Sequence, residues 1–190
     1  MIIEITEKLI PFSQAQLTEW KSGINKRSLL PDYLNEQEVS LILNQPEYHF
    51  GEIHVLKHYH DEGWLGCSSY ALGNNYPASE ARKAGQEKVR RVISKEKRKR
   101  FVEISSKTRD VEYGTGEPDL FLYKPDGEYM FVEVKKQTDR IRPAQFTCIA
   151  QILATLDCKV DIVYLCEEGH SHTPKTYCFN LNTFQGQAKK

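Results

Sequence analysis

Two acidic residues and a lysine stand in the second half of the chain at a spacing that can bring them together. Asp119 and Glu133 lie seven residues on either side of Asp126, in the Lys-Pro-Asp-Gly turn at 124–127. Alternating apolar and aromatic residues on both sides of this turn predict a β-hairpin. In that hairpin the two carboxylates face each other, with Cβ atoms about 4.5–5.5 Å apart. Lys135 projects from the same face as Glu133, so one face carries two acids and an amine.

The repulsion between the two carboxylates indicates what chemistry this set performs. Opposed carboxylates are tolerated where a cation neutralises them or where they share a proton. A divalent ion with oxygen ligands is the simpler account, and Mg²⁺ or Mn²⁺ is the predicted cofactor. Such an ion polarises a phosphoryl oxygen and helps to ionise water, while Lys135 could orient that water or stabilise the transition state. The predicted reaction is hydrolysis of a phosphodiester.

The residues around this set resemble a known nuclease motif. Pro118-Asp119, followed after thirteen residues by Glu133-Val134-Lys135, is similar to the PD-(D/E)xK motif. The flanking residues resemble the VRR-NUC family, namely GEPDL at 116–120, FVEVK at 131–135 and TDR at 138–140. The resemblance spans about residues 111–165. It implies a restriction-endonuclease-like fold and a metal-dependent deoxyribonuclease.

The resemblance also implies roles for single residues and a class of substrate. Asp119, Glu133 and the backbone carbonyl of Val134 would bind the metal. Lys135 would be catalytic, and Gln145 on the following helix would lie near the site. The substrate would be DNA, cut by an endonuclease that acts on flaps or junctions in DNA repair. Small members of the family resemble stand-alone phage or bacterial enzymes, which indicates a possible homodimer.

A further carboxylate on the first core helix belongs to the family's pattern, and three glutamates could supply it. Glu80 and Glu87 lie seven residues apart on a helix predicted for 78–99, and both point away from its apolar stripe, which is typical of solvated residues. Glu52 would serve if the helix predicted for 51–62 is the core one. We favour Glu80 and leave the other two open. Without this carboxylate, the alternative is a catalytically inactive nucleic-acid-binding module of the same fold.

The elements predicted around the motif follow the order helix, three strands, helix and strand. They are a helix at 78–99, a strand at 101–104, an extended segment at 111–116, the hairpin strands, a helix at 143–156 and strands at 159–165 and 175–181. This αβββαβ order predicts an α/β fold with a mixed central sheet.

The first third of the chain has a different pattern. Residues 12–46 show short helical patterns interrupted by prolines, and residues 64–72 fit either a strand or an irregular loop. We therefore predict a helical N-terminal extension at 1–75, packed on a nuclease core at 76–190.

Charge is uneven along the chain although its formal net value is zero, with 26 basic and 26 acidic residues. Residues 79–100 carry ten Lys or Arg against three acids. Such a surplus attracts polyanions, although it also fits a solvated helix face. The predicted nucleic-acid contacts are Arg90, Arg91, Lys95, Arg98, Lys136, Arg140 and Arg142. They would follow a DNA backbone by charge, without reading its sequence.

Cysteine number and hydropathy exclude several other classes. The five cysteines are odd in number and contain no C-x-x-C pair, which argues against a disulfide framework and a zinc site. No apolar window approaches the roughly 18 residues that a membrane helix needs, and the N-terminus shows no signal-peptide pattern. We expect a cytoplasmic protein without a membrane partner.

Overall fold

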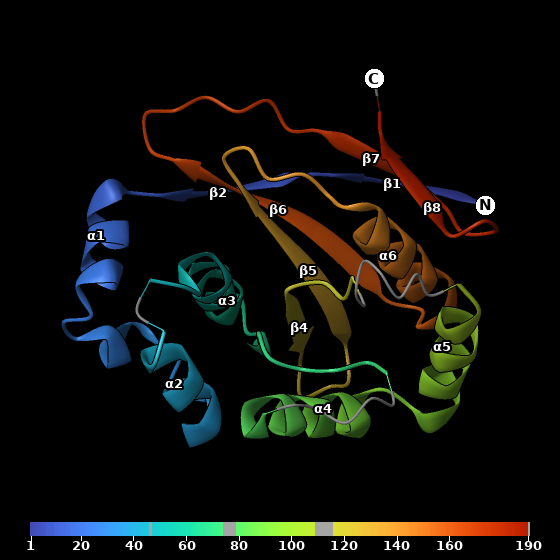
Figure 1. Cartoon of the computed structure of the whole chain (residues 1–190), viewed down its shortest axis with the longest axis horizontal. Coiled ribbons are helices and arrows are strands. Elements are labelled where there is room, and N and C mark those ends of the chain that lie inside the picture. Colours follow the sequence, from blue (N-terminus) through green and yellow to red (C-terminus); the bar gives the residue numbers. More distant parts are fainter. Residues whose placement is uncertain (46, 74–78, 109–115, 190) are drawn as a thin grey trace.

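A five-stranded mixed sheet lies at the centre of the computed structural model, which describes residues 1–45, 47–73, 79–108 and 116–189 (Figure 1). Its strands in spatial order are β2 (Lys8–Phe12), β6 (Lys159–Glu167), β5 (Tyr129–Lys136), β4 (Leu120–Tyr123) and β3 (Leu65–Cys67). β2 and β5 run parallel to β6, whereas β4 is antiparallel to both of its neighbours, β3 and β5. The predicted α/β fold with a mixed sheet is therefore present.

The predicted hairpin is formed by β4 and β5. Leu120 pairs with Val132, so the next step along the ladder sets Asp119 opposite Glu133, as the spacing predicted. The Gly127 N–H donates to the Lys124 carbonyl over 3.0 Å, which closes the turn. Gly127 has a φ of +93°, a conformation that glycine adopts without a steric penalty.

A second, antiparallel sheet lies beside the first. It contains β1 (Ile2–Thr6), β7 (Thr176–Asn180) and β8 (Gln185–Ala188), in the order β1-β7-β8. The strand predicted for 175–181 corresponds to β7, whereas β1, β2 and β8 were not predicted. Only Glu7 separates β1 from β2, so one N-terminal segment joins both sheets.

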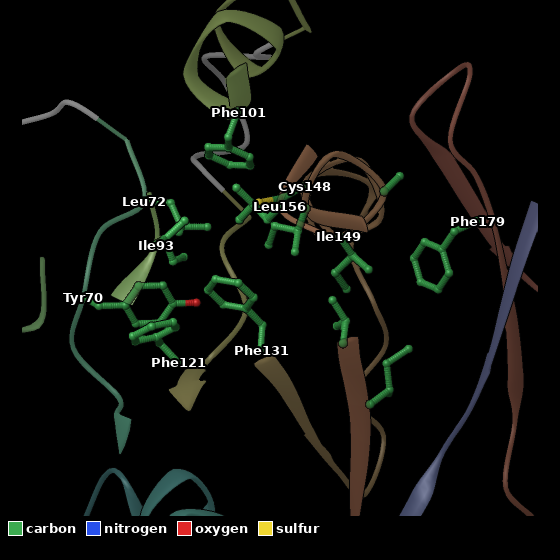
Figure 2. Close-up of a cluster of buried hydrophobic side chains, with 14 of the residues drawn as sticks. Tyr70, Leu72, Ile93, Phe101, Phe121, Phe131, Cys148, Ile149, Leu156 and Phe179 are labelled. Carbon is green, nitrogen blue, oxygen red and sulfur yellow. The ribbon is translucent and has the colours of Figure 1, made fainter. Parts of the chain in front are cut away.

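Helices cover both faces of the central sheet. They are α1 (Gln14–Ser22), the 3₁₀ helix η1 (Lys26–Leu29), α2 (Glu36–Leu43), α3 (Phe50–Asp61), α4 (Glu80–Val92), α5 (Lys95–Thr108) and α6 (Pro143–Thr155). On one face, Phe121 and Phe131 of the hairpin share a buried cluster with Ile149 of α6 (Figure 2). On the other face, Val132 shares a second cluster with Ile53 of α3. Alternate residues of β4 and β5 thus enter two separate cores.

The basic stretch forms two helices where one was predicted for 78–99. Ile93 and Ser94 separate α4 from α5, and Ile93 has extended backbone angles (φ −93°, ψ 126°). Ile93 is buried at this break, and Phe101 of α5 joins the same apolar cluster. The strand predicted for 101–104 was wrong, because a short apolar run fits a helix as well as a strand and α5 continues through it.

The N-terminal third is not purely helical. The predicted helices are present as α1, α2 and α3, but β2 and β3 form the two edges of the central sheet. The helix that packs on the sheet beside the hairpin is α3, whereas the prediction gave that place to 78–99. Along the chain, α3 is followed by β3, then α4 and α5, then β4, β5, α6 and β6. The central sheet contains strands from both sides of residue 75, namely β2 and β3 before it and β4, β5 and β6 after it. A division of the chain into two units at this residue stays a prediction.

All five cysteines are free thiols. None of the helices within the described ranges is long and apolar enough to cross a membrane. The extended segment predicted for 111–116 lies outside the described residues except for Gly116.

Candidate active site

A pocket of about 280 Å³ opens where the end of β5 meets the first turns of α3 and α6. Its lining residues are Gly51, Glu52, Asp119, Val134, Lys135, Lys136, Asp139, Arg140, Arg142 and Gln145. Most of the site residues predicted from the sequence are therefore brought together. Glu133 lies beneath this lining, fully buried, and contacts two of its members.

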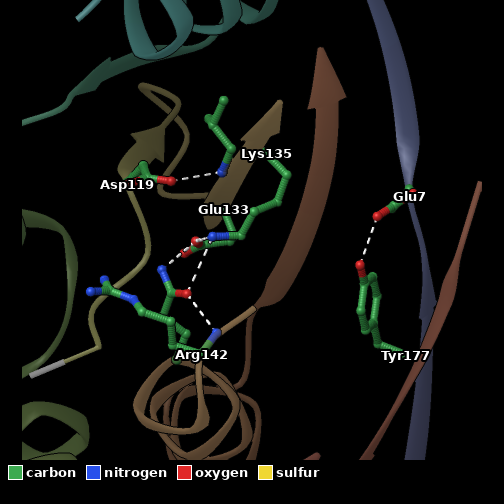
Figure 3. Close-up of polar contacts among 8 residues, drawn as sticks. Glu7, Asp119, Glu133, Lys135, Arg142 and Tyr177 are labelled. Atoms are coloured by element: carbon green, nitrogen blue, oxygen red, sulfur yellow. Dashed lines mark hydrogen bonds and ion pairs between the residues drawn. The ribbon is translucent and has the colours of Figure 1, made fainter. Parts of the chain in front are cut away.

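The Asp119 carboxylate is held by backbone groups of the hairpin. Its Oδ2 accepts a hydrogen bond of 2.8 Å from the Val134 N–H (Figure 3). The preceding Pro118 carbonyl accepts a hydrogen bond of 2.5 Å from the hydroxyl of Tyr70, which is buried. These two contacts fix the start of β4 relative to β5 and to the loop after β3.

The segment before Asp119 is tied to α4 and α6. Glu117 accepts a hydrogen bond from the Leu72 N–H (3.0 Å) and forms an ion pair with Arg82 of α4 (3.1 Å). Gly116 has a φ of +63°, and a Cβ there would lie 2.2 Å from the Ala144 carbonyl oxygen. Only glycine allows the chain to pass this close to the start of α6.

Glu133, Lys135 and Gln145 form a buried polar cluster. The Glu133 Oε1 lies 2.5 Å from both the Lys135 ammonium and the Gln145 amide nitrogen (Figure 3). The Gln145 amide oxygen accepts from Lys135 (3.2 Å) and from the Arg142 N–H (3.0 Å), so the orientation of this amide is fixed. Glu133 Oε2 is also buried, and it has no hydrogen-bond partner among the residues that the structure describes.

The electrostatics of the pocket disfavour two ionised carboxylates. Burial and the charge of Asp119 raise the pKa of Glu133, Lys135 opposes both, and the resulting pKa is about 8. Burial also raises the pKa of Asp119 to about 6, which the nearby Glu52 charge favours and the Val134 N–H opposes. Near neutral pH Glu133 therefore tends to retain its proton while Asp119 is mostly ionised, unless another cation compensates the charge.

The pattern of the chain matches one known domain family. A family model, that of the VRR-NUC domain, matches residues 66–165, just over half of the chain. The chain belongs to the VRR-NUC family. The matched residues run from β3 to β6 and contain the hairpin with Asp119, Glu133 and Lys135. A search of curated proteins and a search of solved structures found no match. VRR-NUC is a nuclease-type domain, so the family implies a nuclease that interacts with DNA.

Of the three candidates for the helix carboxylate in this VRR-NUC protein, the pocket contains Glu52. Glu80, which the sequence analysis favoured, is exposed in the first turn of α4, where it pairs with Lys83 at 2.5 Å. Glu87 is exposed as well. The physical reason is that α3 packs beside the hairpin, and Gly51 permits the approach because a Cβ there would already meet the Leu165 side chain at 3.0 Å.

Basic residues of the VRR-NUC domain fall into two groups. Lys136, Arg140 and Arg142 line the pocket. The other predicted contacts lie on the end of α4 and the start of α5, outside this lining, and are Arg90, Arg91, Lys95 and Arg98. Arg98 donates from Nε to the Ile93 carbonyl (3.0 Å), so part of its role is to cap the break between the two helices.

The donor atoms in the pocket fit a hard divalent cation. In the described part of the chain, no group of three or more His, Cys, Asp or Glu side chains is placed to hold a metal. The candidate set uses two carboxylates, Asp119 and Glu133, together with the backbone carbonyl of Val134. All three supply oxygen, the ligand that Mg²⁺ and Mn²⁺ prefer. The observation in favour is that Glu133 Oε2 has no hydrogen-bond partner in the described part of the chain, because a buried carboxylate oxygen normally has one.

Proposed function

We propose that this VRR-NUC protein is a Mg²⁺- or Mn²⁺-dependent deoxyribonuclease with its active site at Asp119, Glu133 and Lys135. One observation carries the proposal: a buried carboxylate oxygen of Glu133, which has no hydrogen-bond partner among the described residues, lies next to Lys135 and within the influence of the Asp119 charge. The proposal extends the nuclease character of the family to a defined cofactor and defined residues.

The carboxylates would hold the metal together with the Val134 carbonyl. When bound, the ion supplies positive charge that polarises a phosphoryl oxygen and lowers the pKa of water. The raised pKa values of Asp119 and Glu133 support this assignment, because added positive charge favours the ionised form of both groups. Gln145 keeps Glu133 oriented by donating to its Oε1.

Lys135 is the proposed catalytic cation. The residue is only 7% exposed; its ammonium group forms an ion pair with Glu133 (2.5 Å) and donates a hydrogen bond to the Gln145 amide oxygen (3.2 Å). An ammonium held in this way can donate its one remaining N–H toward the pocket. It would stabilise negative charge on the phosphate as the bond breaks, or orient the attacking water.

Glu52 would supply the further carboxylate of the family's pattern. It lies in the first turn of α3 and lines the pocket, and its charge acts on Asp119. From that position it would accept a hydrogen bond from water in the pocket. Residue 52 lies outside the segment that the family model matches, so this assignment rests on the structure alone.

The substrate would be held by charge. Lys136, Arg140 and Arg142 would contact phosphates next to the scissile bond, and the basic residues of α4 and α5 would contact the backbone further away. A preference for flapped or branched DNA and a homodimer that cuts two strands are proposed from the family resemblance. Light scattering that reports only monomer would remove the dimer from the proposal.

Cleavage assays test the proposed activity. Labelled linear, flapped and four-way-junction DNA would be incubated with Mg²⁺, Mn²⁺ or EDTA, comparing wild type with Lys135→Met. Lys124→Met is the matched control, since Lys124 is a lysine of the same hairpin that pairs with Glu128 outside the pocket. We expect cutting that requires metal, survives in the control and falls by about 10²–10³-fold in Lys135→Met. A folded wild type that cuts none of these substrates would favour the inactive binding module instead.

A further inference from the structure

The loop that follows β5 carries much of the positive charge of the pocket. This pocket loop, residues 136–142 with the last residue of β5 included, contributes Lys136, Asp139, Arg140 and Arg142 to the lining. Its first five residues are exposed, so burial contributes little to their conformation. Contacts from elsewhere in the fold must therefore hold the loop if its basic side chains are to meet a phosphate in a fixed geometry.

The turn inside the pocket loop has an uncommon backbone conformation. Gln137 has a φ of +47°, in the left-handed region that residues with a Cβ rarely adopt. The Asp139 N–H donates to the Lys136 carbonyl over 2.9 Å and closes the turn. A left-handed residue other than glycine persists where neighbouring groups fix it.

Tyr164 supplies such a fixing contact. It lies on β6 directly beside Lys135 of β5 in the parallel register. Its hydroxyl donates to the Gln137 carbonyl over 3.1 Å. One strand neighbour of the proposed catalytic lysine therefore reaches over to the turn that carries the phosphate-contacting residues.

The Tyr164 ring is itself held by a residue of the loop between β6 and β7. It stacks on the His172 ring with centroids 3.4 Å apart and planes 5° apart. The His172 Nε2 lies 2.7 Å from Glu7 Oε2, and Glu7 is only 5% exposed. Glu7 also accepts hydrogen bonds from the Tyr177 hydroxyl (2.7 Å; Figure 3) and the Lys175 N–H (2.9 Å). The contact to the pocket loop thus starts from a buried carboxylate between the two sheets.

We propose that Tyr164 is a positioning residue of the active site, which acts through Gln137 on the pocket loop and is backed by His172 and Glu7. The Tyr164 hydroxyl sets the turn so that Lys136 and Arg140 meet the DNA backbone. This inference rests on the proposed function for its substrate. The anchoring of the loop can be measured without any substrate.

Tyr164→Phe removes the hydroxyl and keeps the ring. The matched control is Tyr59→Phe, which also removes one hydroxyl bonded to a β6 residue, Asp161 (2.6 Å), but does not touch the pocket loop. We expect the KM for DNA to rise about three- to tenfold in Tyr164→Phe with kcat within about twofold of wild type. The slope of log Kd against log salt should fall by about one phosphate contact. Equal KM and equal slope in the two variants would overturn the proposal.

Amide hydrogen exchange measures directly whether the Tyr164 hydroxyl holds the pocket loop. In Tyr164→Phe, the peptide that contains Asp139 should exchange about fivefold or more faster than in Tyr59→Phe, because the turn loses its fixed carbonyl. Unchanged exchange would overturn the inference, whatever the activity. A wild type that cuts no DNA would contradict the proposed function, and the exchange result would still decide whether Tyr164 holds the loop.

A double-mutant cycle tests the backing by His172. His172→Ala removes the stacked ring, so we expect it to accelerate exchange in the pocket loop as Tyr164→Phe does. Combining the two should add little, because both act through one contact. Fully additive effects would show that His172 and Tyr164 act separately and would contradict this part of the proposal.

Discussion

On one face of β5, an apolar side chain is followed two residues later by a charged one. The apolar part of this face stabilises the fold, and the charged part belongs to the proposed active site. Phe131, Glu133 and Lys135 project from the same face, and all three are buried. Phe131 packs against Tyr70 and Phe121, with ring centroids 5.9 and 5.3 Å away (Figure 2). Glu133 lies near the charge of Asp119, and its Oε2 has no hydrogen-bond partner within the described ranges of the chain. The first half of the strand face stabilises the fold, and the second half is held in place by it.

The polar half depends on the apolar half for its geometry. Tyr70 belongs to the aromatic cluster through its ring and to the site through its hydroxyl, which donates to the carbonyl just before Asp119. Buried carboxylates with raised pKa values destabilise a fold in their ionised form. The two carboxylates lie on the packed hairpin: Glu133 is in β5 and Asp119 directly precedes β4, and apolar side chains of both strands pack in the two cores.

Removing the aromatic anchor should give the largest effect on stability. Phe131 is fully buried, so Phe131→Ala is expected to lower the free energy of unfolding by about 3–5 kcal/mol through lost contacts and a cavity. Urea unfolding in EDTA measures this. Tyr48→Ala serves as the control, because Tyr48 is exposed and its loss should change stability by less than about 0.5 kcal/mol. Equal losses of unfolding free energy in the two variants would show that the buried Phe131 stabilises the fold no more than an exposed aromatic residue does.

Replacing Glu133 on the polar half of this strand face should have the opposite effect, namely to stabilise the metal-free protein. The folded-state pKa of Glu133 is raised to about 8, so its contribution favours folding at low pH and is lost as pH rises through about 8. Glu133→Gln removes that loss, and we expect it to stabilise the metal-free protein by about 1–3 kcal/mol at pH 8–9.

The pH profile sharpens the same prediction. Melting temperatures in EDTA should differ most between wild type and Glu133→Gln above pH 8, and should converge toward pH 5, where the wild-type carboxyl is protonated. Adding Mn²⁺ should stabilise only the wild type. A variant that is less stable than wild type across this whole range would show that the Lys135 ion pair outweighs burial.

The residue at the boundary should give the smallest effect. Tyr70→Phe keeps the aromatic packing and loses the hydrogen bond to the Pro118 carbonyl, so stability should fall by about 1 kcal/mol. Cleavage should also slow several-fold because the start of β4 is less fixed. Tyr129→Phe is a matched control, since its hydroxyl bonds the Leu156 carbonyl away from the pocket. Both variants slowing cleavage alike would point to a general loss of rigidity.

The sequence predicted the parts of the site that are local. The Pro-Asp-Gly turn and the alternation of apolar residues determine the register of β4 and β5, so the opposition of Asp119 and Glu133 follows from counting. Lys135 follows from the same alternation. The helix α6 was also predictable, because Pro143 opens it and apolar residues recur at helical spacing.

The parts of the site and of the fold that the sequence did not predict depend on contacts between segments far apart along the chain. Glu52 is 67 residues from Asp119, and the apolar pattern of α3 does not say which strands it covers. The contact of Glu7 with His172 joins residues 165 positions apart. β2 was missed because a five-residue edge strand that contains Pro11 carries a weak pattern. The Gly51-Glu52 pair at the start of an apolar helix was the available signal for the close approach of α3.

Calorimetric titration of Mn²⁺ at pH 8 tests the central claim most directly, on wild type, Asp119→Asn, Glu133→Gln and the control Glu80→Gln. We predict one bound ion in wild type and in Glu80→Gln, and no binding at that site in Asp119→Asn or Glu133→Gln. Wild-type affinity should also weaken as pH falls from about 8 to about 6, because protons compete for the two carboxylates. A folded wild type that binds no Mn²⁺, or binding that both carboxylate variants retain, would contradict the account.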